Sequence, residues 1–284
     1  MRERSISALG IVILGLVPAL VGGVIFAFAF TVVTVIAYRE LLPLLHIRQR
    51  RLEVVGYLLI GLAGFLAWLY PDGRYLPLVV ACCMLVPLTS ILHPRSDTRD
   101  TGDWATCTGA VLYLMLPTFA AIALRGTEGS VDRQWFQSLA DAMPSSGATA
   151  EGLGLFLTAL LITWLSDTAA YLVGKSVGRT KLIPRVSPNK TVEGAIGGLI
   201  AAGTTSVVCV VGFGLDVHPL TALIVGILIG ATGMVGDLSE SMLKRRAGVK
   251  DSGNLIPGHG GMLDRIDALI FVVTVTWALL PALR

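Results

Sequence analysis

The side chains best suited to chemistry lie in two short stretches of the chain, of which residues 237–267 are the richer. Four polar residues there fall at positions i, i+3, i+4 and i+7: Asp237, Glu240, Ser241 and Lys244. On a helix this spacing places all four on one face. Such a mixture of carboxylates and a cation is suited to binding a polyphosphate together with a hard metal ion.

A basic and glycine-rich segment continues this stretch toward the C-terminus. It runs through Lys244-Arg245-Arg246, Lys250-Asp251, Pro257-Gly258-His259-Gly260-Gly261 and Asp264-Arg265-Ile266-Asp267. Asp264 and Asp267 lie one turn apart at a predicted helix start, where the helix dipole favours anions. The dipole explains these two carboxylates but not the nearby Asp237, Asp251 and cations. The segment therefore predicts a functional site.

The second stretch begins with Asp167 and continues through a basic loop. Its cations are Lys175, Arg179, Lys181, Arg185 and Lys190, and it ends in Ser187-Pro188-Asn189-Lys190-Thr191-Val192-Glu193-Gly194. Gly174 and Gly178 would let the backbone approach a ligand, and the cations suit phosphate. The charges alone would equally suit membrane topology and anionic lipid headgroups. Asn189 and Glu193 add nothing to topology, and this favours a binding role.

These residues point to phosphoryl or nucleotidyl transfer. Mg²⁺ is usually held by one or two carboxylates, with phosphate oxygens and water completing its shell. The metal and the cations would neutralise the charge that develops in the reaction. The sequence has neither a GxxxxGK[ST] P-loop nor a kinase glycine-rich loop, so a standard nucleotide-binding fold is not expected.

The elements that position these residues must be membrane helices. Of the 284 residues 54% are hydrophobic and only 14% are charged, with a mean hydropathy of +0.75. A soluble domain carries about 25% charged residues. We expect an all-α, polytopic integral membrane protein with about nine spans, at 7–21, 24–45, 54–70, 75–93, 104–124, 153–174, 194–214, 219–242 and 263–283. Pro18 and Gly22-Gly23 are expected to break the first long apolar run into a helical hairpin.

The distribution of Lys and Arg predicts the orientation. With the N-terminus in the cytoplasm, 18 of the 22 Lys and Arg residues lie on the cytoplasmic side of nine alternating spans. This asymmetry favours an N-in, C-out topology. A signal peptide at residues 1–21 is the alternative, but no polar mature segment follows it.

The spans predict two parts joined by a loop. We expect five N-terminal transmembrane helices in 1–124, an extracytoplasmic loop in 125–152 and four catalytic helices in 153–284. The loop carries Trp135-Phe136 and Leu139, which would suit the membrane interface, although a plain linker is favoured. The four Cys residues lie within spans without CxxC spacing and are expected to be small buried residues.

The C-terminal half resembles a known family. Ser241-Met242-Leu243-Lys244-Arg245, Lys250-Asp251, Gly253, Ile256-Pro257, His259-Gly260-Gly261-Met262 and Asp264-Arg265-Ile266-Asp267 match the signature of the CDP-diacylglycerol synthase (phosphatidate cytidylyltransferase) family. Asp167 with Gly174-Lys175 and residues 187–194 resembles a second block of that family. The N-terminal half matches only in length and hydropathy.

The resemblance implies an activity and its requirements. CTP and phosphatidic acid would form CDP-diacylglycerol and pyrophosphate by attack of the lipid phosphate on the α-phosphorus of CTP. The family implies Mg²⁺, with a monovalent cation such as K⁺ beside it, and a homodimer in a lipid bilayer, here the bacterial inner (plasma) membrane. The active site would face the cytoplasm, and nucleic acid is not an expected partner.

The resemblance and the residues together predict roles for individual side chains. Metal ligands are expected from Asp264 first, then Asp237 and Asp267, with Asp251 and Asp167 as further candidates. His259 is expected to organise the loop or donate to phosphate. Catalytic contacts are expected from Lys244, Arg245, Lys250, Asp251, His259 and Arg265, and substrate contacts from Lys175, Ser187, Asn189, Lys190, Glu193, Ser241, Gly260 and Gly261.

Three other functions fit part of the pattern. A polyprenol or phytol kinase, or a cytidylyltransferase for another lipid phosphate, would use the same residue types. A transporter of anionic metabolites would need polar groups near the bilayer midplane and broken helices in both halves. The ionisable residues instead crowd the predicted cytoplasmic rim of the C-terminal half, which disfavours transport.

Overall fold

The computed structural model is an almost entirely helical chain, described for residues 15–47, 49–88, 99–143, 149–255 and 260–283, with only the backbone described at 86–88 and 99–103. The helices are α2 (Gly23–Leu44), α3 (Arg50–Leu69), α4 (Leu76–Leu88), α5 (Arg99–Arg125), α6 (Gln134–Asp141), α7 (Ala150–Val177), α8 (Val192–Phe213), α9 (Pro219–Arg246) and α10 (Leu263–Leu283). A helical segment at 15–21 precedes α2, and the break at Gly22-Gly23 is confirmed by positive φ angles of 71° and 53°.

Seven of these helices are long and apolar enough to cross a membrane: α2, α3, α5 from Trp104, and α7 to α10. This confirms a polytopic helical fold. Two of the nine expected spans are only partly within the described residues. The first, 7–21, loses residues 7–14, and the fourth, 75–93, contains the 13-residue α4. The count of nine and the N-in orientation therefore stay predictions.

The structure differs from the all-α expectation in the basic loop between α7 and α8. Residues there form a short antiparallel hairpin of β1 (Lys181–Ile183) and β2 (Ser187–Thr191), with Lys181 opposite Thr191 and Ile183 opposite Ser187. Pairing of the two strands gives hydrogen-bond partners to backbone N–H and C=O groups that would otherwise lack them between the two helices. Thr191 then ends β2 and caps α8, since its hydroxyl accepts from Gly194 N at 3.1 Å.

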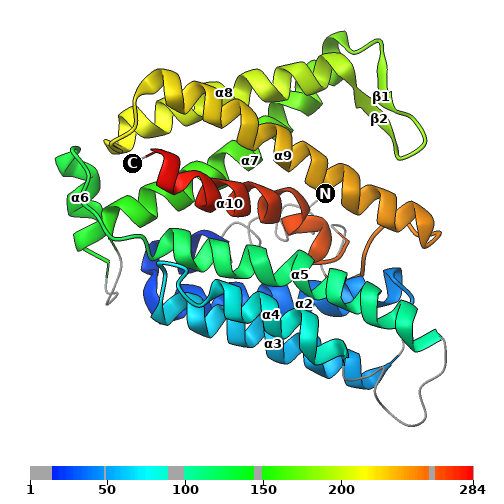
Figure 1. Ribbon diagram of the computed structural model, residues 1–284. Helices are drawn as coiled ribbons and strands as arrows, with labels where there is room; N and C mark the ends of the chain where they lie inside the picture. Colours follow the sequence, from blue (N-terminus) through cyan, green and yellow to red (C-terminus); the bar gives the residue numbers. More distant parts are fainter. Residues whose placement is uncertain (1–14, 48, 89–98, 144–148, 256–259, 284) are drawn as a thin grey trace.

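The last helix connects the two sides of the molecule. Figure 1 shows α10 between a group formed by α2 to α5 and a group formed by α7 to α9. α10 packs against α9, α5, α7 and α2, whereas α8 packs mainly between α7 and α9. The expected division into an N-terminal and a C-terminal part stays a prediction, because α10 shares its contacts between both.

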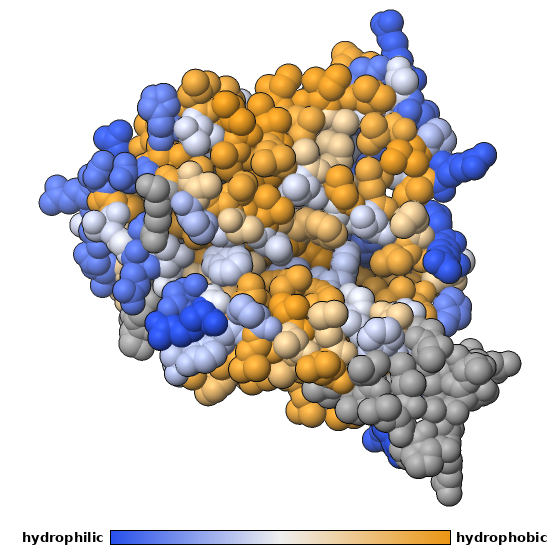
Figure 2. Space-filling model, viewed as in Figure 1, coloured by the Kyte–Doolittle hydropathy of each residue, from blue (hydrophilic) through white to orange (hydrophobic). Residues whose placement is uncertain are grey.

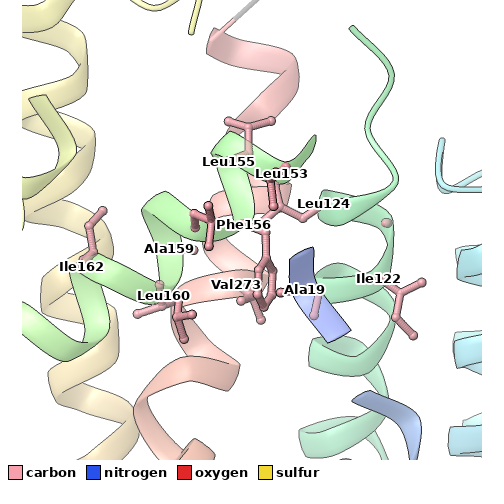
Figure 3. Close-up of a cluster of buried hydrophobic side chains, with 14 of the residues drawn as sticks. Ala19, Ile122, Leu124, Leu153, Leu155, Phe156, Ala159, Leu160, Ile162 and Val273 are labelled. Atoms are coloured by element: carbon pink, nitrogen blue, oxygen red, sulfur yellow. The ribbon is translucent and has the colours of Figure 1, made fainter. Parts of the chain in front are cut away.

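Buried apolar side chains from distant segments fill the space around α10. Figure 3 shows Ala19 of the first helical segment, Ile122 of α5, Phe156 of α7 and Val273 of α10 gathered in one cluster. Arg125 closes this region, because its buried guanidinium donates to Ala19 O at 2.7 Å and to Leu20 O at 3.3 Å. The carbonyls at the end of the first helical segment thus receive a charged cap.

Apolar and polar residues separate along the helix axes on the surface. Figure 2 shows a broad hydrophobic band over the middle of the molecule and hydrophilic residues at its two ends. One end carries the β1–β2 hairpin and the C-terminal end of α9, and the other carries α6 (Figure 1). In α6, Phe136 is buried and stacks on Phe213 at 4.4 Å, while Trp135 stays exposed. The expected loop at 125–152 thus contains an amphipathic helix.

Candidate active site

The predicted polar stripe forms on α9, which continues without a break to Arg246. Lys244 Nζ lies 2.5 Å from Glu240 Oε2 one turn away, and Ser241 Oγ lies 3.4 Å from Asp237 Oδ1. The stripe therefore consists of two pairs of contacting side chains. It faces two different partners: Lys244 and Glu240 face α10, and Asp237 faces the hairpin.

Asp264 joins α9, α10 and the intervening segment. Its Oδ1 accepts from Lys244 Nζ at 2.6 Å. Its Oδ2 accepts from Gly261 N at 2.8 Å and lies 2.9 Å from both N and Oγ of Ser252. Both oxygens are thus supplied with donors from the protein itself, and only 5% of the side chain is exposed. This environment stabilises an ionised carboxylate without a metal.

Glu240 is the most deeply buried carboxylate of the site, with a side chain that is 0% exposed. Its counterion is Lys244, which it shares with Asp264. The Tyr113 hydroxyl of α5 is buried nearby, interacts electrostatically with Glu240 and Asp267, and has no hydrogen-bond partner in the described part of the chain. A buried charge of this kind is tolerated only when a cation is held against it.

A second group of carboxylates lies where α7, α9 and α10 face the hairpin. Asp237 of α9 forms an ion pair with Lys190 of β2, with 2.5 Å between Nζ and Oδ2. Asp267 of α10 interacts electrostatically with Asp237 and with Asp167 of α7, and Asp167 in turn with Asp237 and Lys190. Three helices therefore bring three like charges together around one directly bonded cation.

This second group is suited to a divalent cation. Asp237 and Asp267 are half-buried and Asp167 is exposed. Their like charges repel, and a bound cation relieves that repulsion. Across the described ranges, no three His, Cys, Asp or Glu side chains lie close enough to enclose a metal ion by themselves. A metal here would keep positions open for phosphate oxygens and water, as Mg²⁺ does. Among the predicted ligands, Asp237, Asp267 and Asp167 could hold such an ion, because Lys190 is the one cation ion-paired with them among the described contacts. Asp264 instead accepts from Lys244, Gly261 and Ser252 with both of its oxygens.

The other predicted cations are exposed around this group rather than gathered within it. Lys175 Nζ lies over the ring of Tyr171, 5.8 Å from its centroid. Arg245 donates to Val186 O of the hairpin at 3.4 Å and to Val249 O at 3.3 Å. Lys250, Asp251 and Asn189 are exposed, and Ser187 is half-buried at the start of β2. The hairpin and the C-terminal end of α9 thus carry a rim of cations and polar groups.

Arg265 follows Asp264 on α10 but lines a cavity that Asp264 does not line. It is exposed and, among the described residues, is the one charged residue that lines this cavity of about 70 Å³ between α2, α7 and α10. Phe30, Phe156 and Trp164 are among the residues that line it. Among the described residues Arg265 forms no ion pair with Asp264 or Glu240, and it lines this mostly apolar cavity instead.

Several predicted residues organise the backbone. Glu193 accepts from Arg179 N at 3.0 Å and from Thr180 N at 3.2 Å, and so fixes the turn before β1. A Cβ at Gly178 would lie 2.6 Å from Thr191 Oγ1, so this glycine allows the hairpin to close on α7. Gly260 has φ of +80°, which favours glycine, and the N–H of Gly261 is taken by Asp264. His259 lies outside the described residues.

Two residues of this region were missed by the sequence analysis. Glu40 of α2 accepts from Met262 N at 3.0 Å and Leu263 N at 2.9 Å, and Ser252 Oγ lies 3.1 Å from its carboxylate. Glu40 sits inside the expected span 24–45, and an ionisable residue in a span is itself a signal of function. Ser252 carries no such signal, because its role depends on contacts with distant residues.

Comparison with known proteins identifies the family. The chain matches the Cytidylyltransferase family over residues 2–283. It is 36% identical over 256 residues to a phosphatidate cytidylyltransferase of Staphylococcus haemolyticus, covering 86% of this chain and 95% of the relative. It is 47% identical over 124 residues to proteins of the same name from Staphylococcus saprophyticus and Staphylococcus aureus, matches that span 44% of this chain and about half, 48%, of each relative. The chain belongs to the Cytidylyltransferase family.

Proposed function

We propose that this protein is a phosphatidate cytidylyltransferase, which converts CTP and phosphatidic acid into CDP-diacylglycerol and pyrophosphate. The observation that carries the proposal is the group formed by Asp167, Asp237, Asp267 and Lys190 at one end of the apolar band. These three carboxylates have one ion-paired cation among the described contacts, and exposed cations lie on the hairpin and at the C-terminal end of α9. Such a combination is suited to binding a metal–triphosphate complex. The names of the bacterial relatives support the choice of CTP and phosphatidate.

The reaction requires one bond to form and one to break. A phosphate oxygen of phosphatidate attacks the α-phosphorus of CTP, the bond from that phosphorus to the bridging oxygen breaks, and pyrophosphate leaves. Asp167, Asp237 and Asp267 would hold Mg²⁺, and K⁺ if the site takes a monovalent ion; a bound cation would supply charge neutralisation. The attacking phosphate is already ionised near neutral pH, so the chain need not supply a general base.

The side chains then divide into groups that hold different parts of the substrates. Lys190 is held against Asp237 while 28% of its side chain stays exposed, so it is oriented and still able to reach a phosphate. Lys244 is only 12% exposed and neutralises Glu240 and Asp264, which gives it a positioning role. Arg245 and Lys250 stand at the open rim, where they would meet the triphosphate.

Arg265 is placed to meet the lipid. A guanidinium at the edge of an apolar cavity suits an amphiphile that carries a phosphate, because charge and apolar contacts are satisfied together. We assign the headgroup of phosphatidate to Arg265 and the triphosphate to Lys190 and the α9 rim. The attacking and the attacked phosphates would then meet near the N-terminal end of α10, because in-line attack requires the two reacting atoms to come into contact.

The proposal includes the membrane orientation and assembly. The 18-to-4 distribution of Lys and Arg supports a cytoplasmic site in a bacterial plasma membrane, where CTP is available. The family resemblance supports a homodimer. These features extend the multi-pass membrane character that the seven long apolar helices give.

Product analysis tests the proposal. Purified protein supplied with CTP, Mg²⁺ and phosphatidate should release pyrophosphate, and a panel of other lipid phosphates should release much less. Equal rates on another lipid phosphate would reassign the substrate. Transfer of the γ-phosphate alone, to a polyprenol or phytol, would replace the proposal with a lipid kinase.

A further inference from the structure

Among the described residues, Glu40 is the carboxylate of the N-terminal half that contacts the segment carrying Asp264. It lies one turn before the end of α2, more than 200 residues away in sequence from its partners. Its Oε1 accepts from Met262 N at 3.0 Å, its Oε2 accepts from Leu263 N at 2.9 Å, and Ser252 Oγ lies 3.1 Å from Oε2. One side chain of α2 thus bonds both residues at the start of α10.

These contacts supply what the sequence around α10 lacks. The first N–H groups of a helix have no intrahelical partner, and a local Ser, Thr, Asp or Asn normally accepts from them. Met262 precedes the first residue of α10 and offers no such acceptor. The carboxylate of Glu40 takes this role from another helix, and its charge is also favoured at the positive end of the α10 dipole.

The surrounding backbone is shaped to admit this carboxylate. A Cβ at Gly253 would lie 2.7 Å from Glu40 Oε1, and a Cβ at Gly261 would collide with Glu40 Oε2 and with Ser252 Oγ. Both positions therefore exclude any larger side chain while Glu40 is in place. Their glycines serve the approach of a protein carboxylate, which differs from the phosphate contact expected of Gly261.

The same contacts connect Glu40 to Asp264. Ser252 Oγ lies 2.9 Å from Asp264 Oδ2 and 3.1 Å from Glu40 Oε2, and its single proton serves one of them at a time. Successive N–H groups of Gly261, Met262 and Leu263 divide between the two carboxylates. Moving Glu40 would therefore move the backbone that orients Asp264, and with it the contact of Asp264 to Lys244.

We propose that Glu40 is a positioning residue that holds the start of α10 and the segment around Ser252 in the geometry needed for turnover. It gives the N-terminal half a defined part in the reaction, through an interhelical cap. The kinetic part of this inference rests on the proposed function, whereas the structural part does not. The test therefore combines amide hydrogen exchange with kinetics.

The test variant is Glu40→Gln, which preserves size but places an amide NH₂ where backbone N–H groups need an acceptor. In detergent-solubilised full-length protein, exchange of the amides in 261–263 should rise by about tenfold or more, because their bonds open more often. kcat should fall about tenfold while KM for CTP changes less than about threefold. A purely structural contact would leave kcat unchanged in the folded protein.

Glu53→Gln is the matched control. Glu53 is a half-buried carboxylate of the same half, near the start of α3, and it accepts from Tyr57 Oη at 2.9 Å. This variant should leave both the exchange at 261–263 and kcat within about twofold of the parent. A loss of kcat equal to that of Glu40→Gln would show a general effect of removing charge, and would overturn the proposal.

A second pair of variants covers the case in which Glu40→Gln does not fold. Gly253→Ala pushes a methyl group against Glu40 Oε1, and Gly61→Ala on α3 adds the same group where no atom outside the adjacent backbone of its own helix lies within 4 Å. Only Gly253→Ala should raise exchange at 261–263.

Unchanged exchange in both Glu40→Gln and Gly253→Ala, or raised exchange with wild-type kcat, would overturn the proposal. If wild-type protein shows no cytidylyl transfer, the proposed function fails and the exchange data still decide the role of Glu40.

Discussion

Two groups of carboxylates lie at the same end of the molecule, and they differ in how many hydrogen-bond donors and cations the protein supplies to them. Glu40 and Asp264 accept from backbone N–H groups, from Ser252 and from Lys244. Asp167, Asp237 and Asp267 interact electrostatically with one another, and Lys190 is the one side-chain cation directly bonded to them among the described contacts. The first group joins α2, α9 and α10, and the second leaves negative charge for a ligand to neutralise. Carboxylates at one end of the molecule thus have different roles, which depend on the hydrogen-bond donors and cations around each of them.

Asp237→Asn should give the largest effect on the chemistry. It removes a charge from the unsatisfied group, so we expect turnover to fall by about 10²-fold or more, as for loss of a metal ligand or its immediate support. The melting temperature in detergent should stay near that of the parent, because the change also relieves repulsion. Steady-state rates and a thermal melt measure both. Near-wild-type turnover would remove Asp237 from the site.

Asp264→Asn should also lower turnover by about 10²-fold, but with a loss of stability. The amide would turn an NH₂ group toward existing donors or weaken the bond to Lys244, and each lost bond to a buried charge costs about 1–3 kcal/mol. We therefore expect a lower melting temperature for Asp264→Asn than for Asp237→Asn. Parental stability and parental turnover in Asp264→Asn would show that the group formed by Glu40 and Asp264 does not support the site.

Lys190→Met should weaken substrate binding less severely, by about tenfold in kcat/KM for CTP. The change removes the charge but keeps the length of the side chain, and one bond to a charged group corresponds to roughly that factor. Lys181→Met on β1 of the same hairpin is the control, expected within about twofold. Equal effects of the two variants would indicate general electrostatic attraction by the hairpin.

Arg265→Ala should have the smallest effect and should act on the lipid substrate. We expect KM for phosphatidate, measured as mole fraction in mixed micelles, to rise by about threefold to tenfold, while KM for CTP stays unchanged. This pattern would show that the apolar side of α10 binds the lipid substrate and that its carboxylate side binds CTP. A rise in KM for CTP alone would place Arg265 with the triphosphate.

The sequence allowed prediction of much of the fold from local properties. Hydropathy located the seven long helices, and Gly22-Gly23 located the break before α2, whereas Pro18, also expected to break the run, lies inside the helical segment 15–21. The i, i+3, i+4 and i+7 spacing correctly predicted one polar face on α9. These features depend on neighbours within one or two helical turns, which sequence spacing describes directly.

Features that depend on tertiary contacts could not be predicted in this way. The hairpin forms because β1 pairs with β2 across a basic loop whose charges suggested only topology or phosphate. Asp264 ranked first as a metal ligand by its signature, yet its donors come from Ser252, Gly261 and Lys244. Glu40 approaches these residues only after α2 packs beside α10, so no local pattern connects them.

The central claim is that the unsatisfied carboxylate group supports transfer of CMP from CTP to phosphatidate. The most direct test supplies CTP labelled at either the α- or the γ-phosphorus, with phosphatidate and Mg²⁺, to wild-type protein and to folded Asp237→Asn. The account predicts α-label in the lipid and γ-label in pyrophosphate for wild type, and almost no lipid label for the variant. Label from the γ-phosphorus in the lipid, or equal α-label with both proteins, would contradict it.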